Sequence, residues 1–171
     1  MREELVSGLS HDFGVHPYAK WRGAFWRLLS LVDLGIEPGH GAALEAAEQT
    51  LEWVASPRRL AAIHKRRIDG RVRRCASQDG RALQTCLHVG LRGDPRLDVL
   101  AESLVDTQWP DGGWNCDARP HVTHSSFNET WGRSSVSPRT ARMMPSPAAP
   151  SSSFNIESSI PIALESPRTR C

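Results

Sequence analysis

Apolar side chains recur at helical spacing in four stretches of the chain, at residues 18–34, 42–54, 77–91 and 95–108. Within each stretch the apolar positions fall three or four residues apart, which places them on one face of an α-helix. Polar residues fill most of the other positions, as expected for helices that bury one side only. The pattern therefore predicts an all-α fold built on these four helices.

Glycine residues divide the four helices into two hairpins with similar sequences. Gly35 follows the first stretch and Gly90 lies near the end of the third, and glycine commonly ends a helix in this way. When segment 34–53 is aligned with segment 89–109, these glycines coincide, and so do the terminal tryptophans after a slip of one residue. A repeat of about 55 residues predicts hairpins that stack and bury each other's apolar faces.

Two further local signals refine this outline. Asp94 and Pro95 have the residue types that favour an N-cap and a first helical position, so the fourth helix is expected to begin there. Between the two hairpins, segment 61–76 contains Asp69 followed by Gly70, a strong signal for a tight β-turn. We expect this segment to form a surface excursion with a small β-hairpin.

The chain changes character after Trp131. Residues 17–131 hold the helical patterning and all six tryptophans, whereas residues 132–171 hold six of the 12 prolines and ten serines. A segment of that composition buries too little apolar surface to offset its chain entropy, so we expect a disordered tail. Residues 1–16 form a separate N-terminal segment, which lacks the apolar core of a signal peptide.

A third helical unit is predicted to begin at Ser126. With Glu129 three residues later, this serine has the spacing of a capping box, in which the two side chains satisfy the first amides of one helix. The apolar face that should follow does not continue after Trp131. We therefore expect a truncated or out-of-frame C-terminal end.

Composition and charge exclude several classes of protein. The formal net charge of +2 is too small to predict a nucleic-acid partner. No apolar run approaches the roughly 18 residues that a membrane span needs. The four cysteines form no CxxC pair, so we expect reduced thiols in a cytoplasmic protein.

The most specific motif is the segment 108–114, QWPDGGW, at the predicted end of the fourth helix. Gly112 and Gly113 permit a tight reversal of the chain. The amide of Gln108 is expected to bond the unpaired backbone groups of helix ends, and the ring of Trp114 to stack on it and seal the joint. These four residues are our predicted structural motif.

This motif resembles the QW repeat of squalene cyclases and the related turns of prenyltransferases. The segments WRGAFWRLLSLVDLG, VRRCASQDGRAL and QWPDGGWNCD together look like bacterial squalene-cyclase-like proteins. The resemblance implies a partial α/α toroid of antiparallel helical hairpins and an isoprenoid ligand. The chain departs from the family pattern at Ser103, where an aromatic residue is usual, and Trp53 is at best the remnant of a second motif.

The sequence lacks the residues that carry out the reactions of the families it resembles. Terpene cyclases of this type start their reaction with the acid of a DxDD motif, which the sequence does not contain. The zinc ligand types of prenyltransferases occur together at Cys116, Asp117, His121 and His124, but at a spacing that does not match that family. We interpret them as a polar turn and predict no catalytic, cofactor or metal-binding residue.

Two groups of side chains have both a structural and a functional interpretation. Trp21, Phe25 and Trp26 are expected to pack in the core, with the lining of an isoprenoid cavity as the alternative. Eight cations in segment 58–74 are expected to form a solvated surface, with an acidic ligand as the alternative; they are Arg58, Arg59, Lys65, Arg66, Arg67, Arg71, Arg73 and Arg74.

The sequence thus favours a fragment or degenerate member of the terpene cyclase and prenyltransferase superfamily that has no catalysis of its own. One alternative is an isoprenoid-processing enzyme whose missing acid comes from a partner chain. Another is a non-enzymatic helical-repeat module that binds through segment 58–74. A partial ring leaves apolar helix faces uncovered, so self-association is also expected.

Overall fold

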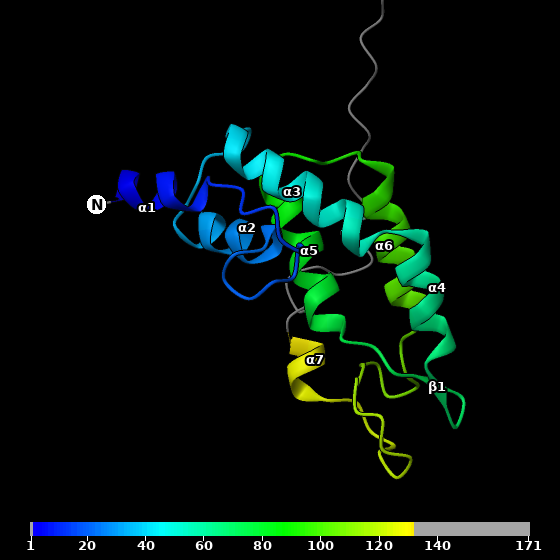
Figure 1. Cartoon of the computed structure of the whole chain (residues 1–171). Coiled ribbons are helices and arrows are strands. Elements are labelled where there is room, and N and C mark those ends of the chain that lie inside the picture. The colour runs from blue at the N-terminus through cyan, green and yellow to red at the C-terminus, as the bar shows by residue number, and fades with distance from the viewer. Residues whose placement is uncertain (1, 132–171) are drawn as a thin grey trace, which may run out of the picture.

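A computed structural model describes residues 2–131 of the chain (Figure 1). This part of the chain is all-α apart from one two-stranded hairpin. Its elements are α1 (Arg2–Leu9), α2 (Ala24–Asp33), α3 (Gly41–Val54), α4 (Pro57–Lys65), β1 (Arg67–Ile68), β2 (Arg71–Val72), α5 (Ala76–His88), α6 (Pro95–Asp106) and α7 (Phe127–Trp131). The predicted tail at 132–171, and any continuation past Trp131, lie outside the described residues.

The four predicted helices are present as α2, α3, α5 and α6. Three of them match within a few residues, but the first begins six residues later than expected, at Ala24. The preceding residues form turns, because Trp21 has a left-handed backbone angle (φ 66°) that no α-helix accepts. The helical spacing of its side chain was therefore misleading.

The core lies where the two hairpins meet. Helix α2 packs on α3, α5 packs on both of them, and α6 packs on α5 and α3. Sixteen buried side chains form one cluster; those with no exposed surface include Leu28, Leu31, Leu51, Val54 and Leu100. Burying each such leucine or valine contributes about 1.5–3 kcal/mol to folding, so the apolar stripes of the sequence account for the stacking.

The two hairpins turn with the same backbone geometry. After α2 and after α5 the chain passes through a glycine of positive φ, 71° at Gly35 and 108° at Gly90. In both turns the amide after the glycine donates to a carbonyl of the last helical turn, with an N–O distance of 3.1 Å, as in a Schellman motif. The amide of Gly39 also donates to the carbonyl of Val89 at 2.9 Å, so the two connections touch.

The terminal tryptophans of the repeat do not occupy equivalent positions. Trp53 lies within α3, whereas Trp109 lies beyond the C-cap residue of α6, Thr107. Helix α6, with 12 residues, is shorter than its counterpart α3, with 14, and this accounts for the difference.

The local signals before α6 and in the excursion are confirmed. The carboxylate of Asp94 accepts the amide of Arg96 at 2.9 Å, as an N-cap does. Strands β1 and β2 pair antiparallel around Asp69 and Gly70, which have φ angles of 47° and 76°. The excursion is smaller than expected, because residues up to Lys65 form helix α4 with Pro57 at its N-terminus.

The N-terminal segment packs against the hairpins. Val6 and Leu9 of α1 are partly buried against the core, and the carbonyl of Leu9 accepts the guanidinium of Arg27 at 3.4 Å. In Figure 1, α1 lies at one end of the molecule and the β-hairpin at the other. Within residues 2–131, none of the helices combines the length and the apolar content that a bilayer crossing requires.

Replacing Gly90 tests whether the hairpin turn needs its left-handed backbone. The change Gly90→Ala puts a side chain at a φ angle of 108°, and we expect it to lower the free energy of unfolding by about 1–2 kcal/mol. Urea unfolding followed by circular dichroism measures the loss. The matched control is Gly8→Ala, in helix α1 with open space around it, where stability should stay the same or rise. Equal effects of the two changes would contradict the assigned turn.

Candidate functional site: a helix corner, a buried ion network and an aromatic hollow

The segment 108–114 forms a closed corner directly after α6. The amide of Trp109 donates to the carbonyl of Gly113, and the amide of Gly112 donates to the carbonyl of Trp109, both at 2.9 Å. The side-chain amide of Gln108 donates to the carbonyl of Gly112 at 2.5 Å. The side chain of Gln108 therefore closes the turn that contains it. The prediction that it binds the backbone groups of a helix end is wrong.

The tryptophans of the corner are bound to their surroundings by their indole nitrogens. Trp114 is 1% exposed and donates to the carbonyl of Leu104, in the last turn of α6, at 3.0 Å. Trp109 is 3% exposed and donates to the carbonyl of Val72 at 2.9 Å. The ring of Trp114 therefore satisfies the helix end, a role predicted for the glutamine, and the ring of Trp109 fixes the β-hairpin.

The corner also receives the start of the third unit. A Cβ atom at Gly113 would lie 2.5 Å from the side chains of Ser125 and Thr130, so only glycine fits there. The amide of Ser126 donates to the carbonyl of Trp114 at 2.7 Å. The predicted capping box is therefore wrong, because the Ser126 amide is bound to the corner.

Two aspartates near the corner, Asp111 and Asp117, are held in their charged form. The backbone amide of Ser125 donates to Asp111 at 2.7 Å and lowers the pKa of its carboxyl group. Hydrogen bonds from the side chain of Arg119 lower the pKa of Asp117 to about 2. Protonating an alkene requires a carboxyl group that holds its proton near neutral pH, so neither residue is suited to that role.

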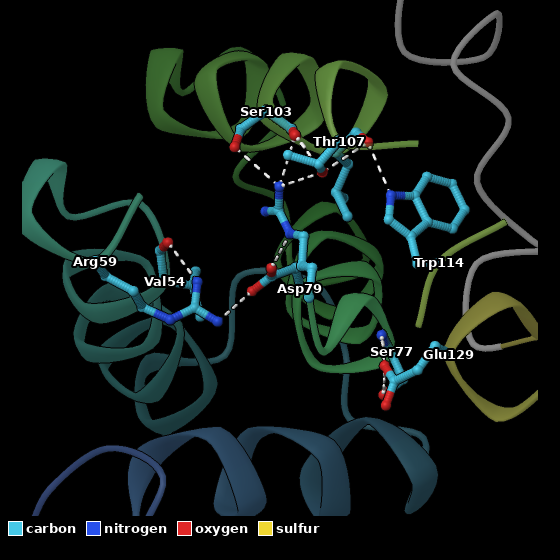
Figure 2. Close-up of polar contacts among 10 residues, drawn as sticks. Val54, Arg59, Ser77, Asp79, Ser103, Thr107, Trp114 and Glu129 are labelled. Atoms are coloured by element: carbon cyan, nitrogen blue, oxygen red, sulfur yellow. Dashed lines mark hydrogen bonds and ion pairs between the residues drawn. The ribbon is translucent and has the colours of Figure 1, made fainter. Parts of the chain in front are cut away.

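A carboxylate with no exposed surface lies between the hairpins. Asp79, in the first turn of α5, accepts Arg59 at 2.7 Å on one oxygen and Arg74 at 2.7 Å on the other. Figure 2 shows Arg59 approaching Asp79 from the side of Val54. Charged groups persist in the interior only when they are paired and hydrogen-bonded, and both conditions hold here.

The two arginines that bind Asp79 also bind backbone carbonyl groups at the ends of two helices. Arg59 donates to the carbonyl of Val54, the last residue of α3, at 3.0 Å. Arg74 donates to the carbonyl and hydroxyl of Ser103 at 2.6 and 2.9 Å and to Thr107 at 3.0 Å, at the end of α6. Asp79 therefore joins the corresponding ends of both hairpins (Figure 2). Ser103 stands where the motif that the corner resembles usually has an aromatic residue, and here it binds Arg74 through its carbonyl and hydroxyl groups.

Fewer cations of segment 58–74 are exposed than the sequence predicted. Arg73 and Arg74 are each 1% exposed, and Arg59 is bound to Asp79. The guanidinium of Arg73 lies 4.8 Å from the ring centre of Trp109, in a cation–π contact. Four of the eight cations are exposed, and they are Arg58, Lys65, Arg66 and Arg67.

A hollow of about 330 Å³ opens between the turns before α2, helix α2 and the start of α5. Its lining is rich in aromatic side chains, with polar groups from α2 and α5; the residues are Tyr18, Trp21, Phe25, Trp26, Leu29, Ser30, Asp33, Ser77, Gln78 and Arg81. Phe25 is buried in the core, Trp26 is half-buried, and Trp21 is 66% exposed. The expected packing in the core is therefore confirmed for Phe25 and wrong for Trp21, whose backbone turns its ring outward, and all three residues line the hollow.

Trp21 is held in a strained conformation beside the hollow. Its φ angle of 66° is one that a bulky side chain rarely adopts. Its ring centre lies 5.1 Å from that of Trp26, and the amine of Lys20 lies 5.4 Å from its ring. Such strain, on an exposed aromatic residue beside a concave surface, is typical of a ligand contact.

The predicted polar turn contains Cys116, Asp117, His121 and His124. Of these, Cys116 lies beside Cys75 and Glu129. The donor atoms of Cys116, Cys75 and Glu129 lie within 4.8 Å of one another, and burial raises the pKa of the Cys116 thiol to about 12. Asp117 is paired with Arg119, and His121 is exposed. The sequence did not connect Cys75 with Cys116, because they lie far apart along the chain, and Glu129 was assigned to a capping box instead.

Removing the charge of Asp79 tests the ion network. Asp79→Asn keeps the shape of the side chain but leaves two guanidinium groups without their counter-ion, so we expect the free energy of unfolding to fall by about 3–5 kcal/mol. Urea unfolding measures the change. Asp98→Asn, an exposed position in α6, is the matched control and should stay within about 0.5 kcal/mol of the parent chain. A small effect at Asp79, similar to that at Asp98, would rule out a structural role for the network.

Comparison with known proteins finds no matching family model, no matching characterised protein and no matching solved structure. The family resemblance of the corner motif is therefore a proposal that depends on this chain's own residues and their geometry.

Proposed function

We propose that this chain is an arc of a squalene-cyclase-like α/α toroid that binds an apolar isoprenoid-type ligand and has no catalysis of its own. The aromatic hollow is the observation that carries this proposal. An isoprenoid chain is apolar and unsaturated, so the faces of Trp21 and Trp26 suit it both by apolar contact and by ring stacking. The polar groups of the lining, which include Arg81, would meet a ligand's polar end.

The repeated hairpins support the toroid part of the proposal. Both pairs of helices turn through the same hydrogen bonds, their connections touch at Gly39 and Val89, and the corner receives a further helix. A stack of this kind extends by adding equivalent units. The chain would then supply part of a ring, in a reducing compartment such as the cytoplasm, where the free thiols Cys75, Cys86 and Cys116 persist.

The absence of catalysis is proposed from the chemistry of the carboxyl groups. The sequence has no DxDD motif, and the lowered pKa values of Asp111 and Asp117 keep both groups charged. An isoprenoid-processing enzyme would therefore need its acid from a partner chain. Binding of acidic ligands through segment 58–74 is the weaker alternative, because Arg59, Arg73 and Arg74 are engaged inside the fold.

Replacing Trp21 separates ligand binding from folding. Trp21→Gly removes the aromatic surface and also relieves the left-handed strain, so we expect affinity to fall about tenfold or more while the fold becomes about 1 kcal/mol more stable. Farnesol and farnesyl diphosphate are the probes, and quenching of tryptophan fluorescence measures binding. If both ligands bind the parent chain, a higher affinity for farnesyl diphosphate than for farnesol would indicate a contact between the diphosphate and Arg81.

The control for this experiment is a tryptophan outside the hollow. Trp131 is 65% exposed on α7, so Trp131→Ala should leave the affinity unchanged. Incubation of the parent chain with squalene and with prenyl diphosphates, followed by mass spectrometry, should give no product. A turnover product would contradict the non-catalytic proposal, and equal affinities in both variants would contradict the site.

Self-association is expected from the apolar side chains that the arc leaves uncovered. Phe127 and Trp131 stack on each other with ring centres 5.3 Å apart and are 72% and 65% exposed. Exposed apolar groups of this size favour contact with a second copy. Sedimentation velocity should show reversible association of the parent chain, weakened by Phe127→Ser. A single monomeric species at all concentrations would contradict it.

A further inference from the structure

Two thiols and a carboxylate meet at one point, from three separate segments of the fold. Cys75 is the N-cap residue of α5, Cys116 follows the corner, and Glu129 lies on α7. Their nearest donor atoms all lie within 4.8 Å of one another, and all three residues are half-buried. The cluster is separate from the lining of the aromatic hollow, which contains none of these three residues.

The spacing of these donor atoms is close to what a tetrahedral zinc ion requires. With zinc–sulfur bonds of about 2.3 Å, two ligand atoms in a tetrahedral site lie about 3.7 Å apart. Separations of at most 4.8 Å therefore need movements of only about 1 Å, which small side-chain rotations supply. Thiolate sulfur also selects zinc over magnesium or calcium, which prefer oxygen ligands only.

The carboxylate is already oriented toward the thiols. One oxygen of Glu129 accepts the amide and the hydroxyl of Ser77, at 3.0 and 2.9 Å. The other oxygen accepts the thiol of Cys116 at 3.3 Å. Outer hydrogen bonds that hold a carboxylate in this way are a common feature of metal sites, because they fix the ligand before the ion arrives. Figure 2 shows Glu129 directed at Ser77.

The position at the start of α5 also favours bound negative charge. Cys75 caps a helix of 13 residues, and the positive end of a helix dipole stabilises a thiolate. Zinc would neutralise two of the three negative charges that the deprotonated ligands carry. Cys75 therefore offers its sulfur at a helix end that favours a thiolate ligand, and the bound ion would compensate most of the remaining negative charge.

We propose that Cys75, Cys116 and Glu129 bind Zn²⁺, with a water molecule in the fourth position. The ion would tie α7 and the corner to the start of α5, and so hold the third unit against the second hairpin. On binding, each thiol releases its proton to solvent and its sulfur forms one bond to zinc, with no oxidation or reduction. A disulfide between the two cysteines is the competing use of this geometry, but it gives Glu129 and its contacts with Ser77 no role.

The test uses the full chain, reduced and freed of metal, with Cys171→Ser as the background so that the thiol outside the described residues cannot contribute. Co²⁺ serves as the spectroscopic probe, and Zn²⁺ as the competitor. We expect one equivalent of Co²⁺ to produce a sulfur-to-cobalt charge-transfer band that Zn²⁺ abolishes. Zinc should also raise the melting temperature.

Three variants test the proposed ligands, and a fourth is the control. Cys75→Ser and Cys116→Ser should lose the charge-transfer band and the zinc-dependent rise in melting temperature. Glu129→Gln keeps the oxygen that Ser77 bonds but lacks the charge, and should weaken zinc binding about tenfold or more. The matched control is Cys86→Ala, since this buried thiol lies outside the cluster, and it should bind cobalt as the parent does.

Two results would overturn the proposal. One is a cobalt band that is absent from the parent chain or survives in both cysteine variants. The other is a chain purified without reductant that has lost two hydrogens, links Cys75 to Cys116 in peptide mapping, and binds no metal once reduced. Both readouts are independent of isoprenoid binding, so this proposal and the proposed function can fail separately.

Discussion

The buried carboxylate of Asp79 is the interaction on which the arrangement of the two hairpins depends. Apolar packing brings α2, α3, α5 and α6 together, but it is non-directional and permits helices to slide. Two guanidinium groups bound to one carboxylate at 2.7 Å fix the ends of α3 and α6 relative to α5. Because leaving any of these charges unpaired in the interior is costly, the network specifies one register of the stack.

The corner depends on that register, and the hollow is lined in part by the same helix, α5. Arg74 holds the end of α6 at Ser103, and the next residue along, Leu104, accepts the indole of Trp114. The corner can therefore close only where the helix end has been positioned. Ser77, Gln78 and Arg81 of α5 lie across from α2 and complete the lining of the aromatic hollow. The first turns of α5 thus hold both the buried carboxylate, which reaches the joint at the end of α6 through Arg74, and part of the lining of the hollow.

The sequence predicted what depends on local chemistry and failed where distant residues decide. The N-cap at Asp94 and the turn at Gly70 were predicted because their side chains and backbone angles act within a few residues. Helix α4 was not predicted, because a proline such as Pro57 can follow the end of one helix or begin the next, and only the packing of α4 decides.

The candidate sites show the same division. Arg74 has the sequence context of a solvated charge run, and its contact with Ser103, 29 residues away, has no local signal. Glu129 has capping-box spacing but binds Ser77, more than fifty residues away in sequence. The most direct measurement of the central claim is a double-mutant cycle between Arg59→Met and Arg74→Met, by urea unfolding. A shared carboxylate predicts that their effects depart from additivity by about 1 kcal/mol or more, whereas additivity within about 0.5 kcal/mol would contradict it.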